Sequence, residues 1–238
     1  MQPIANFEGT ISGHNRIIPE IDWHGVDTVL LDMDGTLLDR HFDDYFWERH
    51  VPQVFAQKNA LGLEEARTLL LKRYKKEEGS LAWTDLDFWS KELELDIPGL
   101  KMQVAHLIRV HPYVLDFLQA VKKVKKRLFL VNNAHFKTLA IKMDKTTIDK
   151  HFDAIICAAE VGAAKEDPLF WKKLAQKMSI NPCRTMLADD NENVLYAAQE
   201  FGVRILIYVA RPSSALPVLF SPVFPSIEYF SEIMPHKG

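Results

Sequence analysis

The chain has 238 residues, of which 47% are hydrophobic and 26% charged, with a formal net charge of −3. This composition is that of an ordinary soluble globular protein, large enough for one domain or for a domain that carries an insert. The small negative charge provides no basic field to attract nucleic acid or an anionic membrane, so we expect neither as a partner. No run reaches the roughly 18 apolar residues that span a bilayer.

The cysteines and the N-terminus predict a cytoplasmic protein. Cys157 and Cys183 lie in apolar settings without CxxC spacing, as expected for reduced thiols in a cytosolic protein. The first residues, MQPIANFEGTISGHN, have neither the cationic start nor the apolar centre of a signal peptide. We expect the protein to be a monomer or a weak homodimer.

Short apolar runs along the chain predict the strands of a parallel sheet. They are rich in Val, Ile and Leu without polar alternation, as expected for strands covered on both faces. The runs are VDTVLLD (26–32), RLFLVN (127–132), DAIICA (153–158), RTMLAD (184–189) and RILIYV (204–209). Helical patterns at 112–126 and 167–178 alternate with them, and Asp167 before Pro168 is a plausible N-cap. This alternation predicts an α/β fold with a doubly wound parallel sheet.

Helices fill the interval between the first two predicted strands. Helical patterns occur at 42–58, 63–78, 83–94 and 100–109, with breaks near Gly62, Gly79-Ser80 and Pro98-Gly99. Four helices exceed any normal crossover connection. They therefore predict an inserted unit near the tip of the first strand, a common way to close a site at the carboxyl ends of a parallel sheet.

This pattern divides the chain into three parts. We expect an N-terminal extension at 1–22, an α/β core domain made of 23–40 and 111–238, and a helical cap domain at 41–110. Beyond Arg211, prolines recur at short intervals. This spacing predicts an irregular segment that ends in a short helix near 226–233.

Polar and charged side chains follow the predicted strands at one edge of the sheet, where α/β proteins bind ligands. These residues are Asp32 and Asp34 after the first strand, Asn132–His135 after the second, Lys165 after the third, and Asp189 and Asp190 after the fourth. Uncompensated carboxylates cost several kcal/mol when they are removed from water. Four of them beside one lysine therefore indicate a cation, and Mg²⁺ prefers such oxygen ligands.

Three of these segments resemble motifs of the haloacid dehalogenase-like (HAD) superfamily of phosphohydrolases. DMDGTLLD (32–39) resembles the first motif, KEDPLF (165–170) the third and ADDNENVLYAAQEFGV (188–203) the fourth. The resemblance extends from Asp27 to about Gly202. It implies a Rossmann-like core with a cap inserted after the first strand.

The resemblance also implies Mg²⁺-dependent hydrolysis of a phosphate monoester through an aspartyl-phosphate. Asp32 is the expected nucleophile, and Asp34 the expected proton donor to the leaving oxygen and later the activator of water. Lys165 is expected to neutralise charge on the nucleophile and the phosphoryl oxygens. Asp32, the backbone carbonyl of Asp34 and Asp190 are the expected metal ligands, with Asp189 acting through a water or pairing with the lysine.

Asn132 departs from the family pattern, which places Ser or Thr at the tip of the second strand to bind the phosphoryl group. An Asn amide has two N–H donors, so we expect Asn132, together with Asn133 and Lys165, to bind phosphate. The alternative is a degenerate HAD domain that binds a ligand with little catalysis. His135 is expected to support the site and not to react.

Within the superfamily, the sequence is similar to bacterial GMP/IMP nucleotidases. The similar segments are DTVLLDMDGTLLD (27–39), FDDYFW (42–47), NAH (133–135) and, in the expected cap, LAWTDLDFWSKELELDI (81–97). This resemblance implies a 5′-nucleotidase that acts on purine nucleoside monophosphates. The alternative substrate is a sugar phosphate or another small ester, because many HAD phosphatases are promiscuous.

Candidate substrate contacts lie just after the first motif, at Asp43, Asp44 and Tyr45. A purine also needs an aromatic or apolar slot. Aromatic residues at helical spacing usually pack in a core, however. We therefore expect packing roles for Phe46, Trp83 and Trp89.

Overall fold

The computed structural model describes residues 16–235, so most of the expected N-terminal extension lies outside the described residues. The six strands within these residues form one sheet, in the order β3-β2-β1-β4-β5-β6, and every neighbouring pair is parallel. The strands are β1 (Thr28–Leu31), β2 (Arg127–Asn132), β3 (Ala154–Cys157), β4 (Thr185–Asp189), β5 (Ile205–Val209) and β6 (Ser226–Ile227). The predicted doubly wound α/β fold is confirmed.

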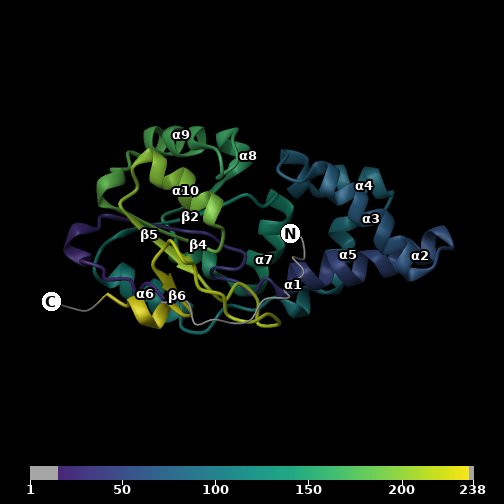
Figure 1. The fold of residues 1–238 in the computed structure, drawn as a ribbon, viewed down its shortest axis with the longest axis horizontal. Coiled ribbons are helices and arrows are strands. Elements are labelled where there is room, and N and C mark those ends of the chain that lie inside the picture. Colours follow the sequence, from purple (N-terminus) through teal and green to yellow (C-terminus); the bar gives the residue numbers. More distant parts are fainter. Residues whose placement is uncertain (1–15, 236–238) are drawn as a thin grey trace.

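Helices cover both faces of the sheet (Figure 1). Helices α6 (Val114–Lys123) and α7 (Phe136–Thr146) pack on one face, and α8 (Ala158–Val161), α9 (Pro168–Met178) and α10 (Glu192–Phe201) pack on the other. Val29 and Leu31 belong to the first buried cluster and Leu30 to the second, because successive strand side chains point to opposite faces. This double cover explains why β1 reads as an unbroken apolar run.

The interval between β1 and β2 is helical, as expected. It contains α1 (His41–Tyr45), a π-helical turn (Phe46–His50), α2 (Val51–Asn59), α3 (Leu63–Glu77), α4 (Leu86–Leu93) and α5 (Ile97–Gln103), with 3-10 turns at Leu81–Thr84 and Ala105–Leu107. We refer to residues 41–110 as the insert. Figure 1 shows the insert beyond the carboxyl ends of the strands.

Predicted helix boundaries around α4 and α5 are wrong, and α5 ends at Gln103 where a helix was predicted to continue to 109. Helix α4 begins at Leu86 because the Asp85 side chain accepts hydrogen bonds from the N–H groups of Asp87 and Phe88, at 2.8 and 3.2 Å. Pro98 does not break the chain but lies in the first turn of α5, where its missing N–H leaves no hydrogen bond unmade.

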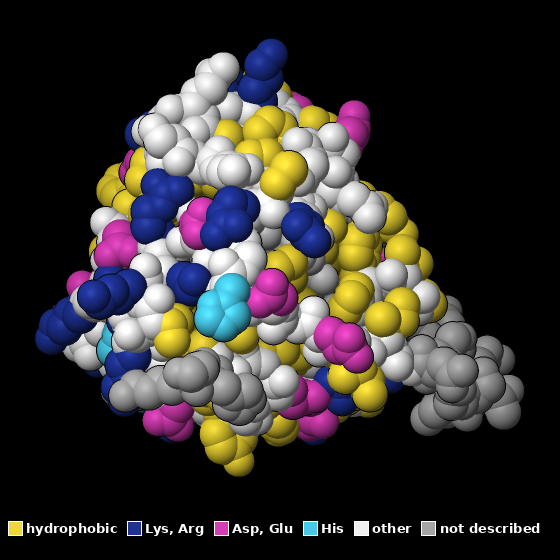
Figure 2. All heavy atoms as spheres, turned by 90° about the vertical axis from the view of Figure 1, so that its left-hand side faces the viewer, with side chains coloured by type: hydrophobic (Ala, Val, Ile, Leu, Met, Phe, Trp, Pro, Cys, Tyr) yellow, Lys and Arg dark blue, Asp and Glu magenta, His cyan; other side chains and the backbone are white. Residues whose placement is uncertain are grey.

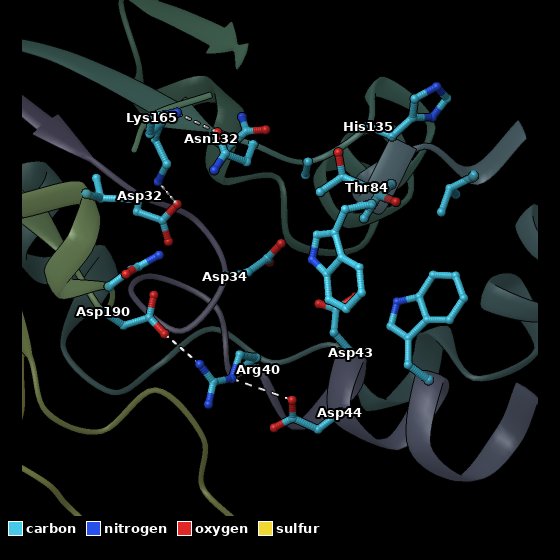
Figure 3. Close-up of a pocket in the computed structure, with 18 of the residues that line it drawn as sticks. Asp32, Asp34, Arg40, Asp43, Asp44, Thr84, Asn132, His135, Lys165 and Asp190 are labelled. Atoms are coloured by element: carbon cyan, nitrogen blue, oxygen red, sulfur yellow. Dashed lines mark hydrogen bonds and ion pairs between the residues drawn. The ribbon is translucent and has the colours of Figure 1, made fainter. Parts of the chain in front are cut away.

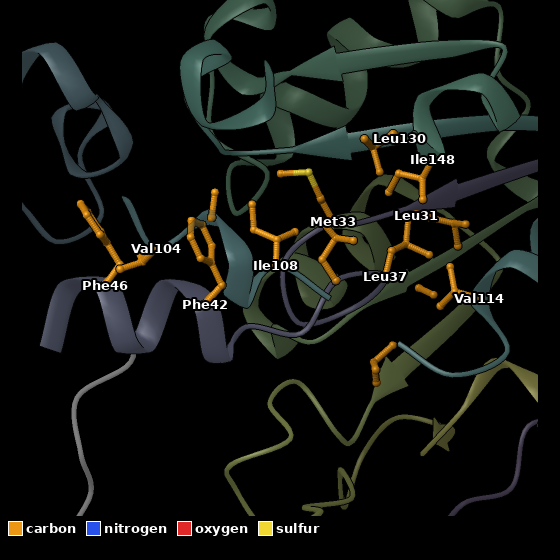
Figure 4. Close-up of a cluster of buried hydrophobic side chains, with 14 of the residues drawn as sticks. Leu31, Met33, Leu37, Phe42, Phe46, Val104, Ile108, Val114, Leu130 and Ile148 are labelled. Atoms are coloured by element: carbon orange, nitrogen blue, oxygen red, sulfur yellow. The ribbon is translucent and has the colours of Figure 1, made fainter. Parts of the chain in front are cut away.

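A continuous hydrophobic cluster joins the sheet to the insert. Leu31 on β1, Met33 and Leu37 after it, and Phe42 and Ile108 of the insert all belong to this cluster, as Figure 4 shows. Close packing makes such a cluster resist displacement of its parts. The loop after β1 is therefore held from both sides.

The C-terminal segment contains a strand that the sequence analysis assigned to a helix. Ser226 and Ile227 form β6 beside β5, and only Phe230–Ile233 is a 3-10 helix. Phe230 anchors this helix on α6, with its ring centre 4.6 Å from that of Phe117. None of the helices in residues 16–235 is long and apolar enough to cross a bilayer.

The end of the molecule away from the insert is covered by mixed charges. Asp27 and Asp153 directly precede β1 and β3, and they pair with Arg184 and Lys122, respectively. Figure 2 shows basic, acidic and hydrophobic side chains interspersed on this side of the molecule. At the opposite end of the molecule, by contrast, charged side chains are buried together at the strand tips.

Candidate active site

Asp32 and Lys165 form the buried centre of the site. Asp32 directly follows β1, Lys165 lies in the loop before α9, and their side chains are only 8% and 3% exposed. Lys165 Nζ donates to Asp32 Oδ1 at 2.5 Å and to Asp189 Oδ2 at 2.7 Å. Burial alone would lower the pKa of Lys165, but the carboxylates of Asp189 and Asp32 outweigh it and raise that pKa. Lys165 is therefore a permanent positive charge between two motifs.

The loop that carries Lys165 is held by hydrogen bonds from two sides. Asn133 Oδ1 accepts from the Lys165 backbone N–H at 3.0 Å, and Trp171 Nε1 donates to the Lys165 carbonyl at 2.7 Å. Asn133 Nδ2 donates to Glu166 Oε2 at 2.9 Å. The side chain of Asn133, which we expected to bind phosphate, is thus engaged in holding this loop.

Asp190 pairs with an arginine that the sequence analysis did not identify. Arg40 Nη1 donates to Asp190 Oδ2 at 2.8 Å, and Arg40 Nε lies 3.5 Å from Asp44 Oδ1 (Figure 3). Burial, reinforced by the neighbouring Asp32, raises the pKa of Asp190 to about 7 in spite of Arg40. The negative charge of the Asp190 carboxylate is therefore poorly compensated by protein cations alone.

Gly35 allows Asp190 to lie against the turn after β1. Its φ of +89° is in the left-handed region, and its N–H donates to the Leu38 carbonyl at 2.8 Å. A Cβ at this position would lie 2.4 Å from Asp190 Oδ2. Both the backbone conformation and the close approach require glycine.

Three carboxylates offer oxygen ligands to one cation. Asp32, Asp189 and Asp190 each present one carboxylate oxygen, and these oxygens all lie within 4.8 Å of one another. Burial, together with Asp32 and Asp190, raises the pKa of Asp189 well above its usual range in spite of Lys165. Crowded carboxylate oxygens at a sheet edge are the ligands that Mg²⁺ takes, so the donor set fits this ion.

Asp34 lies between this group and the insert (Figure 3). Its Oδ1 accepts from Lys142 Nζ at 2.5 Å, and 27% of its side chain is exposed. Burial raises the pKa of Asp34 to about 6, although Lys142 opposes the shift. A carboxyl group that titrates near neutral pH is suited to both giving and taking a proton.

Asn132 ends β2 with an amide that has no partner. The residue is 1% exposed, and neither Nδ2 nor Oδ1 has a hydrogen-bond partner within the described part of the chain. A buried polar group left in this way costs about 1–3 kcal/mol. A phosphoryl oxygen that accepted from Nδ2 would remove this cost, and Figure 3 shows Asn132 beside Lys165.

His135 lies where α7 begins and faces the insert. Its Nδ1 accepts from the Lys137 N–H at 3.4 Å, and its Nε2 lies 3.5 Å from Asp85 Oδ1. His135 also lines the cavity. Its contacts therefore cap a helix and approach the start of α4.

A cavity of about 230 Å³ joins the strand tips to the insert. The insert contributes acidic and aromatic lining residues: Asp43, Asp44, Trp47, Tyr74, Trp83 and Trp89. Of the three candidate substrate contacts, Asp43 and Asp44 line this cavity and Tyr45 does not. Phe46 and Trp89 are buried as expected, at 0% and 1% exposure, whereas Trp83 is only partly buried.

Three cations near the site were not predicted from the sequence. Arg40 follows the first motif directly, and this position was the available signal. Lys101 and Lys142 lie on α5 and α7, and they are only 2% and 1% exposed. Nothing in the helical pattern distinguishes these two from the exposed lysines around them, because their burial arises only when the insert packs on the core.

The sequence profile of haloacid dehalogenase-like hydrolases matches residues 26–202. This range contains the strand-tip residues described above. The chain belongs to the haloacid dehalogenase-like hydrolase family. The expectation that it is an enzyme of the phosphatase type is confirmed by this match and by the relatives below.

Two curated relatives match most of this HAD-like hydrolase. The GMP/IMP nucleotidase YrfG of Escherichia coli (strain K12) is 36% identical over 215 residues, which cover 90% of this chain and 97% of that protein. The phosphorylated carbohydrates phosphatase of Thermotoga maritima is 20% identical over 188 residues, which cover 75% and 82%. The first similarity confirms the predicted resemblance to GMP/IMP nucleotidases.

A solved HAD phosphatase has the same fold. The crystal structure of the HAD phosphatase from Thermococcus onnurineus matches with a TM-score of 0.73 at 21% identity. The match covers 87% of this chain and 96% of that one. It therefore includes both the sheet and the insert.

Proposed function

We propose that this enzyme is a Mg²⁺-dependent phosphatase of nucleoside monophosphates, preferably purine ones. The observation that carries the proposal is a single cavity with Asp32, Lys165 and Asp190 on one side and aromatic side chains of the insert on the other. The 36% identity to a GMP/IMP nucleotidase supports the substrate class.

The proposed reaction has two steps on Asp32. In the first, a carboxylate oxygen of Asp32 forms a bond to phosphorus while the bond from phosphorus to the 5′ oxygen breaks, and Asp34 gives that oxygen a proton. In the second, a water oxygen forms a bond to the phosphorus of the aspartyl-phosphate while the bond from phosphorus to the Asp32 oxygen breaks; Asp34 takes a proton from the water, and inorganic phosphate and the free Asp32 carboxylate result. Lys165, 2.5 Å from Asp32, stabilises the negative charge in both steps.

Asp32, Asp190 and the backbone carbonyl of Asp34 are the proposed Mg²⁺ ligands. When bound, the ion supplies positive charge that keeps the carboxylates ionised and offsets charge on the phosphoryl oxygens. Because Asp189 already accepts from Lys165 at 2.7 Å, we assign it a role through a water or through the lysine.

The substrate would span the cavity from phosphate to base. Asn132 Nδ2 and Lys165 are the proposed phosphate contacts. In the insert, the ring centres of Trp47 and Trp83 lie 5.6 and 6.4 Å from that of Tyr74, all edge-on. Trp47 and Trp83 are partly buried, so each has ring surface left for a purine to stack on.

We also propose that residues 41–110 act as a cap domain over a core of 23–40 and 111–238. The insert contributes Asp43, Tyr74, Trp89 and other residues to the lining of the cavity, which supports this division. Cys157 and Cys183 are free thiols, which supports a reducing cytoplasmic location. A monomer or weak homodimer remains the proposed state.

Phosphate release from GMP, IMP and glucose 6-phosphate, with Mg²⁺ and with chelator, tests the substrate class. We expect kcat/KM for GMP and IMP to exceed that for the sugar phosphate about tenfold or more, and chelation to abolish release. The similarity to a carbohydrate phosphatase is the observation in favour of the alternative. A tenfold preference for the sugar phosphate would refute the nucleotidase proposal.

Trp83→Ala tests the base slot. Loss of stacking on a base is worth about 1–3 kcal/mol, so we expect kcat/KM for GMP to fall about 5- to 150-fold and that for glucose 6-phosphate to change little. Trp23→Ala is the matched control, because Trp23 is another partly buried tryptophan but does not line the cavity. Equal losses on both substrates would remove Trp83 from substrate recognition.

A further inference from the structure

Two buried lysines outside the three motifs form a chain of ion pairs that ends at Asp34. Lys142 Nζ lies 2.5 Å from Asp34 Oδ1 and 2.5 Å from Asp43 Oδ2. Lys101 Nζ lies 2.6 Å from the other oxygen of Asp43. When Asp34 is ionised, the order Asp34, Lys142, Asp43, Lys101 alternates in sign and sums to zero charge; when Asp34 is protonated as the proposed acid, the sum is one positive charge. Both lysines are almost fully buried, so water screens their three ion pairs less than it screens pairs at the surface.

This series of ion pairs connects the insert to the core. Asp34 follows β1 and Lys142 lies on α7, so both belong to the core, whereas Asp43 on α1 and Lys101 on α5 belong to the insert. Helix α5 packs against α7. Lys142 therefore has one carboxylate partner in the core and the other in the insert.

Stability alone is a weak reason to bury these charges. Replacing a buried ion pair by well-packed apolar residues is often neutral or stabilising, because desolvation opposes the Coulombic gain. Aromatic rings compensate the two ammonium groups in part, since Lys142 Nζ lies 5.4 Å from the ring centre of Phe42 and Lys101 Nζ lies 5.0 Å from that of Phe46. The series of ion pairs can instead serve to position a side chain. Asp34, the proposed proton donor, is the residue at one end of the series.

We propose that Lys142 is a positioning residue that holds the Asp34 carboxylate towards the scissile phosphate ester. The inference rests on the proposed function. Lys142 does not line the cavity, so it acts through Asp34 and not on the substrate. Its bond to Oδ1 restricts rotation of the carboxylate, which remains 27% exposed. Asp43, fixed in turn by Lys101, holds Lys142 from the insert side.

A comparison of two esters with different leaving groups distinguishes a positioning role of Lys142 from a general structural role. A nucleoside 5′ alkoxide needs a proton to leave, whereas p-nitrophenolate leaves without one. The first step on p-nitrophenyl phosphate therefore does not need Asp34 as an acid. Single-turnover rates with enzyme in excess, measured on GMP and on p-nitrophenyl phosphate, isolate this first step.

For Lys142→Met, we expect the single-turnover rate on GMP to fall about 100-fold and that on p-nitrophenyl phosphate to fall at most about threefold. Asp34→Asn is expected to show the same separation. Lys122→Met is the matched control, because Lys122 is an exposed lysine that pairs with Asp153 far from the cavity. It should change neither rate.

Lys142→Arg provides a second variant if Lys142→Met does not fold. It keeps the positive charge, but its longer planar group shifts the contact with Asp34, so we expect a loss of about tenfold on GMP alone. Equal losses on both esters in a folded variant would overturn the inference. If the wild type does not turn over GMP, the proposed function fails instead, and glucose 6-phosphate replaces GMP in the comparison. A wild type inactive on all three esters would overturn both.

Discussion

Gly35→Ala is expected to impair catalysis far more than folding. An L-residue in the left-handed conformation costs about 1–2 kcal/mol, and the φ of Gly35 is +89°. In a protein of this size, that loss lowers Tm by about 2–8 °C. The new Cβ would also lie 2.4 Å from Asp190 Oδ2. The carboxylate would have to move by about 1 Å to restore an ordinary contact distance.

This displacement acts on the site itself. Asp190 Oδ2 is the oxygen that accepts from Arg40 at 2.8 Å, and Asp190 is a proposed Mg²⁺ ligand. A misplacement of about 1 Å in a catalytic site costs about 100-fold in rate. We therefore expect Gly35→Ala to lower kcat/KM for GMP about 100-fold and to raise the Mg²⁺ concentration needed for half-maximal activity.

Gly202→Ala is the matched control for backbone strain. Gly202 also has a positive φ, of +101°, but a Cβ there would meet no heavy atom within 4 Å. It lies at the end of α10, away from the cavity. Thermal unfolding and phosphate release against Mg²⁺ concentration should show similar losses of Tm in both variants, and loss of activity only in Gly35→Ala. Equal activities in the two variants would refute the reasoning about Asp190.

Four further predictions concern the same cavity. Asp32→Asn should abolish phosphate release while Tm stays within a few degrees of the wild type, and a retained rate would exclude the covalent route. Asn132→Leu should lower kcat/KM about 10- to 150-fold, because a hydrogen bond to a charged phosphoryl group is worth about 1.5–3 kcal/mol. Asn132→Thr should keep most of the activity, and a large gain from a nearly inactive wild type would favour a degenerate domain. The raised pKa values of Asp34 and Asp190, about 6 and about 7, stabilise the folded state at low pH, and this contribution is lost as pH rises through them. The chelated protein should therefore have a lower Tm at pH 8 than at pH 5, and Mg²⁺ should raise Tm more at pH 8. A Mg²⁺ effect that does not depend on pH would contradict this assignment.

The sheet could be predicted because its central strands are buried on both faces. An unbroken apolar run such as Thr28–Leu31 is a signal that needs no tertiary information. Ser226–Ile227 carries no such signal, since two residues show no periodicity and pair only because β5 is already in place. The start of α4 was also predicted wrongly. The helical pattern begins before Asp85, the residue that caps α4, so the pattern alone does not show where the helix starts.

The motif residues could be predicted because each directly follows a strand or belongs to a resemblance that fixes its position. Asp32 and Asp190, from distant parts of the sequence, are brought together by the pairing of β1 with β4. The lysines of α5 and α7 could not be found in this way. A lysine on a helix reads as exposed unless the neighbouring element is known, and for Lys142 that neighbour is the insert.

The distribution of cations changes the electrostatic argument made from the sequence. There, four carboxylates shared one lysine and a metal. In the structure, Lys165 forms ion pairs with Asp32 and Asp189. Arg40 pairs with Asp190, and Lys142 pairs with Asp34. The proposed nucleophile, Asp32, and the proposed proton donor, Asp34, are the same residue type two positions apart, so we expect their different roles to come from their surroundings. Because Asp34 pairs with Lys142 and Asp32 with Lys165, we expect a change at Lys142 to alter the proposed proton donor while leaving the pair between Lys165 and the proposed nucleophile in place.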